Sequence, residues 1–233
     1  MSKRSTLRRK RERGSYERDV IDAILDEGLV CHVGFVDEGS TFVVPMTYAR
    51  VEDVLYLHGA AANHLLKSST GCEACVTVTL LDGLVLARSA FHHSMNYRSV
   101  MLFGTGERVD DPEEKRAAVL AIVDHMAPGR SRDARPPTES ELRSTQVVRF
   151  AVHEGSAKVR TGGPIEEPDD LGLRIWAGQI PIDLVAGPPM ADPSLPEGVS
   201  APAYVASYPP RRRTAPYQRA TTGDVSSRPS AGG

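Results

Sequence analysis

Residues 87–100, ARSAFHHSMNYRSV, carry many side chains that can bind a ligand or move a proton. These fourteen positions hold two adjacent histidines, two arginines, three serines and a tyrosine. Arginine and hydroxyl groups suit the oxygens of phosphates and sugars. His92 and His93 are candidate catalytic residues, because a histidine near its ordinary pKa can donate a proton or hold an anion. A hydrogen bond to the loop itself is the alternative role for each. No nearby carboxylate or cysteine completes a metal-ligand spacing, so we predict no metal site here.

A second stretch, residues 56–69, indicates an anion site. A predicted strand ends at His58 and Gly59, and a helix predicted over 61–70 carries Asn63, His64 and Lys67. A helix N-terminus offers free amides and a positive dipole to an anion. His64 and Lys67 are three residues apart on one helix face, so both can reach one phosphate. A surface helix with solvated side chains is the alternative, which the spacing leaves open.

The three cysteines, Cys31, Cys72 and Cys75, are too few and too odd in number for a disulfide framework. Cys72 and Cys75 form a C-x-x-C pair, but this pair lacks the second pair of a zinc site and the βαβ context of a redox motif. We expect Cys75 to be a core residue and the compartment to be the reducing cytoplasm.

Helices are predicted over 15–27, with Ser15 as the cap, and over 110–126, with Asp111 as the cap and Glu114 as its capping-box partner. The β-rich runs are 30–36, 41–49, 54–59, 74–80, 84–90, 96–109 and 145–160. Asp82-Gly83 predicts a hairpin turn between 74–80 and 84–90. Pro45 predicts that the strand 41–49 is an edge strand or bulges. Alternation in the strand 96–109 places Tyr97, Ser99, Met101 and Phe103 on one face, opposite Arg98, Val100 and Leu102.

Six or more strands with few helices, none in βαβ alternation, predict a mostly β, antiparallel barrel. Three regions are expected: a basic N-terminal arm (1–14), the barrel domain (15–186) and a tail (187–233). The tail is rich in Pro, Ser and Arg and too polar to order itself by burial.

Composition limits the partners. The net charge of −2 argues against a nucleic-acid partner, and the basic arm is most simply a solvated tail. No run of 18 apolar residues exists, so no membrane span is expected. The basic N-terminus has no apolar stretch after it and does not match a secretory signal.

The block DGLVLARSAFHHSMNYRSVMLFGTG (82–106) resembles the signature of the pyridoxamine 5′-phosphate oxidase-like family. Within that family it is most similar to the flavin-nucleotide-binding branch, which is related to nitroimidazole-resistance proteins. Supporting blocks follow in order: RRKRERGSY (8–16), FVVPMTY (42–48), YLHGAAANHLL (56–66), GSAKVRTGGP (155–164) and WAGQIPI (176–182). The resemblance covers about residues 8–185 and leaves the tail unexplained.

The resemblance implies a split β-barrel that forms a homodimer with FMN at the subunit interface. It also implies an FMN-dependent oxidoreductase acting on a small molecule. By this resemblance, the residues expected along the flavin ring are Val44, Pro45, Met46 and Thr47. Those expected at the phosphate end are His58, Asn63, His64 and Lys67. The resemblance also implies that Tyr97, Arg98 and Ser99 face the flavin across the barrel.

Departures from the family pattern leave other functions open. The Arg-x-His segment with which the name-giving oxidase binds its substrate phosphate is absent, which argues against pyridoxamine phosphate as the substrate. A nicotinamide donor is plausible, although no dinucleotide fingerprint is present. The alternatives are a flavin-binding module without catalysis, a haem-binding split barrel, and a deazaflavin in place of FMN.

Overall fold

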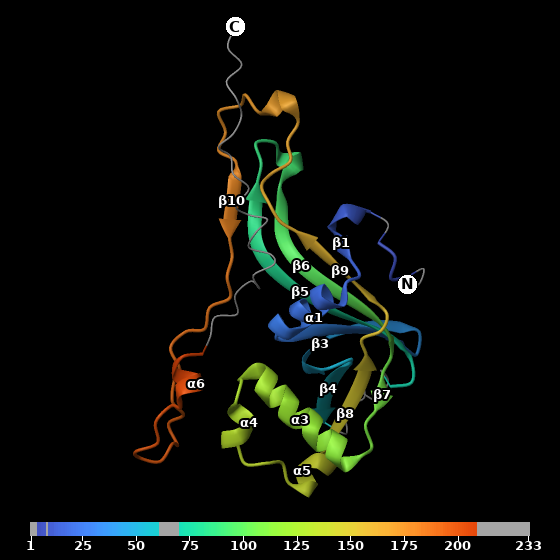
Figure 1. Ribbon diagram of the computed structural model, residues 1–233, viewed down its shortest axis with the longest axis vertical. Coiled ribbons are helices and arrows are strands. Elements are labelled where there is room, and N and C mark those ends of the chain that lie inside the picture. Colours follow the sequence, from blue (N-terminus) through green and yellow to red (C-terminus); the bar gives the residue numbers. More distant parts are fainter. Residues whose placement is uncertain (1–3, 8, 61–69, 209–233) are drawn as a thin grey trace.

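The structure is a computed structural model that describes residues 4–7, 9–60 and 70–208. Within these residues ten strands form one strongly curved sheet in which all neighbouring strands are antiparallel (Figure 1). The order is β1-β9-β6-β5-β2-β3-β4-β8-β7, and β10 also pairs with β5. The predicted mostly β, antiparallel architecture is confirmed. The helix predicted over 61–70 lies outside the described residues, apart from its last residue.

The strands are β1 (Gly14–Ser15), β2 (Val30–Asp37), β3 (Ser40–Val51), β4 (Val54–Ala60), β5 (Glu73–Leu86), β6 (Ser94–Thr105), β7 (Glu107–Arg108), β8 (Thr145–Ala151), β9 (Gly155–Arg160) and β10 (Gly178–Pro181). The α-helices are α1 (Arg18–Glu27), α3 (Pro112–Met126), α4 (Arg130–Asp133), α5 (Glu139–Ser144) and α6 (Ala203–Ala206). Short 3-10 helices are η1 (Arg11–Arg13), η2 (Ala90–His92) and η3 (Pro168–Asp170).

Helix α1 packs inside the curve of the sheet. Its apolar side chains Ile21, Ile24 and Leu25 are buried in the main core. The predicted cap Ser15 is wrong, because Ser15 pairs with Ala157 of β9 and the helix begins only at Arg18. The end predicted at Gly28 is correct, and a side chain there would lie 2.5 Å from Val78. The glycine lets α1 lie close to β5.

Helix α3 begins as predicted. Asp111 caps it by accepting a hydrogen bond from the Glu114 amide at 2.7 Å, and Pro112 is the first helical residue. The Glu114 carboxylate does not close a capping box; it accepts a hydrogen bond from the Tyr56 hydroxyl at 3.0 Å instead. A contact across the fold has therefore replaced the local one.

The predicted hairpin turn at Asp82-Gly83 is wrong. β5 runs through both residues as one strand, with a register shift against β6 between Leu81 and Gly83. A bulge of this kind inserts a residue without ending a strand. Gly83 is required because a Cβ there would lie 2.8 Å from the Ile180 carbonyl oxygen of β10. The chain turns later, around η2, before it enters β6.

The predicted alternation along β6 is confirmed. Arg98, Val100 and Leu102 are buried, whereas Met101 is 42% exposed on the opposite face. The same alternation in β2, β3 and β5 gives the sheet an outer face whose exposed apolar side chains include Val30, Val36, Val43, Leu81 and Met101. Within the described residues, no helix is both long and apolar enough to cross a lipid bilayer.

Candidate functional site

The sheet divides where β3 changes its neighbour. Tyr48 to Val51 pair with β4, whereas Ser40 to Thr47 pair with β2. β4 continues past this point along β8, with His58 opposite Val147. We call the opening between residues 44–47 of β3 and residues 58–60 of β4 the β3–β4 fork. Since a strand presents backbone groups to both sides, residues 44–47 offer hydrogen-bonding groups to the fork.

The fork contains five of the predicted cofactor residues. The predicted edge strand or bulge at Pro45 is wrong, because β3 lies between β2 and β4 and Pro45 pairs with His32 of β2 in an unbroken register. Among the described residues, Pro45 nevertheless lacks a second paired strand on the side of the fork. Val44 and Met46 pack partly against the core, so Pro45 and Thr47 face outward. The pairing of Tyr48 with Leu57 makes Thr47 and His58 the first residues beyond the last β3–β4 pair. The structure therefore brings the predicted ring residues next to His58.

His58 is a polar side chain at the fork whose hydrogen-bonding capacity the described residues do not satisfy. Among the described residues its Nδ1 atom is buried and has no hydrogen-bond partner. Burial lowers the pKa of His58 below its usual value, which favours the neutral imidazole. A buried nitrogen without a partner is costly unless something binds it. Asn63, His64 and Lys67, the other predicted phosphate ligands, lie outside the described residues.

Tyr97 and Ser99 share the outer face with Thr47, but they are not adjacent to the fork. β2 and β5 stand between β3 and β6, which puts the two groups about 14 Å apart at the usual spacing between strands. Within one chain, the outer face connects them but no single small site contains them. Their predicted role toward a flavin remains a prediction.

Arg98 faces the core and is fixed there by two carboxylates. Its Nε and Nη2 atoms donate to Asp82 at 2.9 and 2.8 Å, and its Nη1 and Nη2 atoms donate to Glu27 at 2.5 and 2.6 Å. The side chain is 1% exposed. Hydrogen bonds and charge from both carboxylates outweigh desolvation, the largest single effect, and raise the pKa of Arg98. The two carboxylates therefore balance its charge within a buried triad of Glu27, Asp82 and Arg98.

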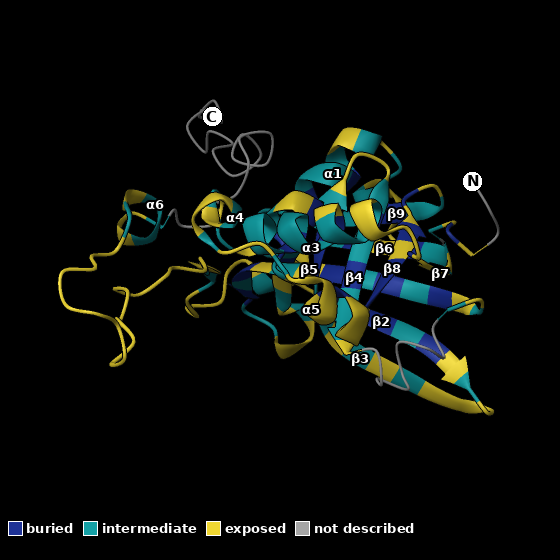
Figure 2. Ribbon diagram, turned by 90° about the horizontal axis from the view of Figure 1, so that it is seen from below, coloured by how far each residue is buried: buried dark blue, intermediate teal, exposed yellow. Residues whose placement is uncertain are grey.

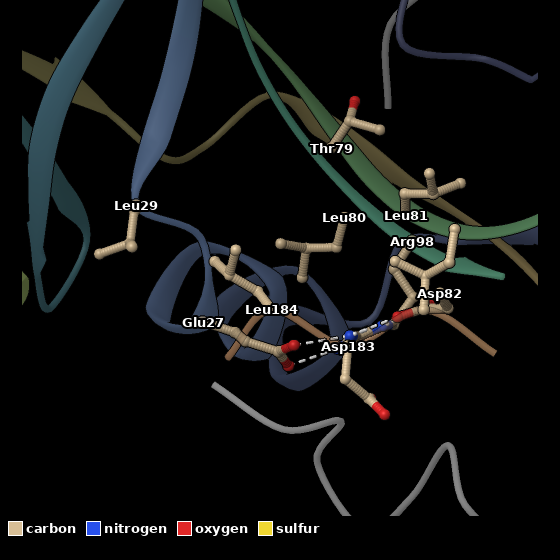
Figure 3. Close-up of a pocket in the computed structure, with 10 residues that line it drawn as sticks. Glu27, Leu29, Thr79, Leu80, Leu81, Asp82, Arg98, Asp183 and Leu184 are labelled. Carbon is tan, nitrogen blue, oxygen red and sulfur yellow. Dashed lines mark hydrogen bonds and ion pairs between the residues drawn. The ribbon is translucent and has the colours of Figure 1, made fainter. Parts of the chain in front are cut away.

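A cavity of ≈ 250 Å³ opens beside the triad (Figure 3). It lies beside the part of β5 that follows its last pair with β2, at Thr77, and precedes its first pair with β10, at Gly83. Its walls are mainly leucine and its polar groups mainly carboxylate. The lining residues are Glu27, Leu29, Thr79, Leu80, Leu81, Asp82, Arg98, Ile182, Asp183 and Leu184.

The two candidate catalytic histidines lie at the β5–β6 turn, at the opposite end of the molecule from β4 (Figure 1). His93 Nδ1 is 3.0 Å from the Ser89 carbonyl oxygen, the loop contact considered as its alternative role. His92 Nε2 lies 3.8 Å from Glu167, and its Nδ1 is buried without a partner among the described residues. The structure does not bring either histidine to the fork within one chain. No group of three or more His, Cys, Asp or Glu in the described part of the chain is placed to hold a metal ion.

Sequence reasoning missed Glu27 and Asp82. Glu27 is the last residue of α1 and is 9% exposed in its side chain, and Asp82 is 7% exposed. The available signal was the strand position of Arg98: an arginine that alternates with Val100 and Leu102 must be buried, and a buried charge needs a partner. The Asp-Gly pair hid that partner, because it is also a common turn signal.

Comparison with known proteins identifies the family. The sequence model described as Pyridoxamine 5'-phosphate oxidase matches residues 17–159. The chain belongs to this family, and the curved half-barrel is its split-barrel fold. No curated protein matches the chain at the threshold applied.

Three solved structures are similar to this chain. The flavocytochrome Anf3 from Azotobacter vinelandii is 37% identical with a TM-score of 0.84, covering 88% of this chain and 95% of its own. The FAD and haem binding protein from Mycobacterium smegmatis is 33% identical with a TM-score of 0.82, covering 86% and 100%. A 5-nitroimidazole antibiotic resistance protein, so described from Bacteroides thetaiotaomicron, is 29% identical with a TM-score of 0.52, covering 63% and 86%.

Proposed function

We propose that this chain binds a flavin nucleotide at the β3–β4 fork and uses it to oxidise or reduce a small molecule. The observation that carries the proposal is the fork: among the described residues, Val44 to Thr47 pair with β2 alone, and they lie beside the buried Nδ1 of His58, which has no partner among the same residues. A flavin ring has donors and acceptors along one edge, which suit a free strand edge, and a flat apolar surface. Two similar proteins bearing flavin or flavocytochrome names support it.

A bound flavin supplies hydride and single-electron transfer, and the protein supplies binding, orientation and electrostatics. In this chain residues 44–47 would orient the ring through their backbone groups, and His58 would bind as a neutral donor or acceptor. The sequence resemblance implies FMN, whereas one similar protein binds FAD. The two flavins differ by a second phosphate and an adenosine, so the flavin released from the protein decides between them.

We also propose that the protein is a homodimer joined through the outer face. Val43 is 64% exposed there, Val36 57%, Val30 45%, Leu81 43% and Met101 42%. Apolar side chains gathered on one face mark an interaction surface. A second copy on this face would bring its own Tyr97 and Ser99 toward the fork of the first. The dimer would thus bring together the two groups of predicted flavin residues that lie apart within one chain.

Haem is a second candidate ligand, with His58 as the axial residue. The neutral imidazole is the form that binds a metal, and burial favours that form in His58. The two solved structures described above at 37% and 33% identity are haem or cytochrome proteins by name. Haem would use the histidine that the first proposal gives to the flavin, so the two ligands are alternatives at His58.

The visible spectrum of the purified protein, before and after adding flavin and haemin, tests these assignments. We expect two flavin bands and, if His58 binds iron, a Soret band that moves on reduction. His58→Ala should lose the Soret band, and it should weaken flavin binding without abolishing it, because the strand edge at residues 44–47 is unchanged. His153→Ala, a change at an exposed histidine outside the fork, is the control and should keep both. A wild-type protein that stays colourless after reconstitution would overturn the proposed function, and an unchanged Soret band in His58→Ala would exclude the axial role.

A further inference from the structure

The segment between β10 and α6 is exposed along its whole length. All nineteen residues from 183 to 201 are exposed, and they form no helix or strand apart from one bridge residue, Leu184. They include large apolar side chains: Met190 is 95% exposed, Val185 69% and Leu184 64%. We call residues 183–201 the strap. In Figure 2 it projects from the body as an exposed loop.

Both ends of the strap are fixed to the body. Before it, β10 pairs with β5 from Gly178 to Pro181. After it, the Tyr204 hydroxyl donates to Asp133 at 2.7 Å and accepts from Arg130 at 3.2 Å. The Tyr208 hydroxyl donates to the Met126 carbonyl oxygen. A chain held at both ends but unburied between them has lost conformational freedom without gaining buried surface. Such a segment is suited to contact with another molecule.

The charges of the strap are all of one sign. Asp183, Asp192 and Glu197 are its ionisable residues, with no lysine or arginine among them. Hydrogen bonds from the Ser194 hydroxyl and amide lower the pKa of Asp192, so that carboxylate stays ionised at neutral pH. Four prolines favour an extended chain, which spans roughly 3 Å per residue. The strap is therefore an acidic, extended segment that can reach a distant surface.

A basic surface of matching character lies at the N-terminal arm. β1 pairs with β9 so that Gly14 faces Lys158, which brings the arm against the end of β9. We call this group the basic corner: Arg9, Lys10, Arg11, Arg13, Lys158 and Arg160. Among the described residues, none of the six forms an ion pair with a carboxylate. Glu12 is the only acid among residues 9–13.

Arg160 shows that this positive charge is not balanced. It is 5% exposed, and its nitrogens donate to Asn96 and to the Gly162 and Gly163 carbonyl oxygens, all neutral groups. Burial and then repulsion from Arg13 lower the pKa of Arg160. An anionic partner would relieve this repulsion.

The strap and the basic corner cannot meet within one chain. Figures 1 and 2 place the strap and the N-terminal arm on opposite sides of the sheet. We infer that the acidic strap of one protomer docks on the basic corner of a second copy of this chain, and that the second strap makes the same contact in return. In a two-fold dimer each contact occurs twice, so both straps would clasp the partner. The inference rests on the dimer proposed above and not on the flavin.

Sedimentation at micromolar concentration, in low and high salt and without cofactor, tests the contact. We expect a wild-type dimer whose dissociation constant rises with salt, because exposed charges are screened. The strap variant Asp183→Asn/Asp192→Asn/Glu197→Gln should raise that constant about tenfold, since several exposed ion pairs add modest terms. The arm variant Arg9→Glu/Lys10→Glu/Arg11→Glu should weaken the dimer at least as much. Combining the arm variant with Asp183→Lys/Asp192→Lys/Glu197→Lys should restore it.

The matched control removes three exposed carboxylates elsewhere, Asp19→Asn/Glu38→Gln/Glu113→Gln, and should leave the dimer unchanged. A dimer that survives both the strap and the arm variants unchanged would overturn the docking and leave the outer-face dimer standing. A wild-type monomer in all conditions would overturn both. Flavin binding, measured separately on the same samples, reports on the proposed function alone.

Discussion

Arg98 shows how one residue in a strand can fix a helix and a bulge together. Its guanidinium holds Glu27, which ends α1, and Asp82, which is the inserted residue of the bulge in β5. Both carboxylates and the guanidinium are almost fully buried. Removing one partner from a buried ion pair leaves an uncompensated charge, which costs far more than the pair contributes. The triad therefore acts as a joint between α1, β5 and β6 below the cavity.

Arg98→Met should lower the free energy of unfolding by about 3–5 kcal/mol, because two buried carboxylates lose their partner. Urea unfolding measures the change. Arg149→Met is the control: Arg149 also contacts two carboxylates, Glu107 and Glu114, but is 45% exposed, so its loss should cost about 1 kcal/mol or less. Adding Glu27→Gln and Asp82→Asn to Arg98→Met should recover part of the loss. Equal costs for Arg98→Met and Arg149→Met would contradict the triad.

For single residues, the sequence predicted the face of a strand on which a side chain lies better than it predicted the partners of that side chain. Alternation placed Arg98 opposite Tyr97 and Ser99 correctly, because the period of a strand is a local property. It could not find Glu27, which lies 71 residues away and reaches Arg98 only through the packing of α1. His58 was a candidate by its residue type, whereas its buried Nδ1, which has no partner in the described part of the chain, appears only in the fold.

The bulge in β5 shows that local sequence signals are also insufficient to predict where a whole strand ends. Asp-Gly favours a tight turn locally, but β5 is held on both sides by β6 and by β2 and β10. Pairing along fourteen residues outweighs the local preference, and the glycine serves the close approach of β10. By contrast, α3 was predicted well because its cap, its first-turn proline and its apolar residues are all local signals.

Gly83→Ala should loosen β10 and the start of the strap. The added Cβ would lie 2.8 Å from the Ile180 carbonyl oxygen, so one of the strands must move. We expect faster proteolysis within residues 182–202 and a stability loss of about 1–3 kcal/mol. Gly172→Ala, where a Cβ meets nothing within 4 Å, is the control and should leave both unchanged. If β10 stayed equally protected in Gly83→Ala, the bulge would not depend on this close approach.

For the molecule as a whole, strand count and the absence of βαβ alternation were enough to predict an antiparallel barrel, because fold class follows from the pattern of elements. The fork was partly predicted, through the resemblance at Val44 to Thr47. The strap was not, because Pro-rich and polar composition indicates only that a segment cannot bury itself. Whether such a segment gains order from a partner depends on a surface that local patterns do not reveal.

Titration of the cofactor-free protein with FMN and FAD, followed by flavin fluorescence, is the most direct test of the fork as the flavin site. We predict one flavin bound per chain. Thr47→Glu, which places a bulky negative charge at the fork, should weaken binding by about tenfold or more, or about 1.4 kcal/mol. Val51→Glu is the control, because Val51 lies on the same strand, 42% exposed, and pairs with Val54 at the end of the β3–β4 ladder away from the fork. It should bind as the wild type does. Flavin binding that is absent from the wild type, or equally tight in Thr47→Glu, would contradict the account.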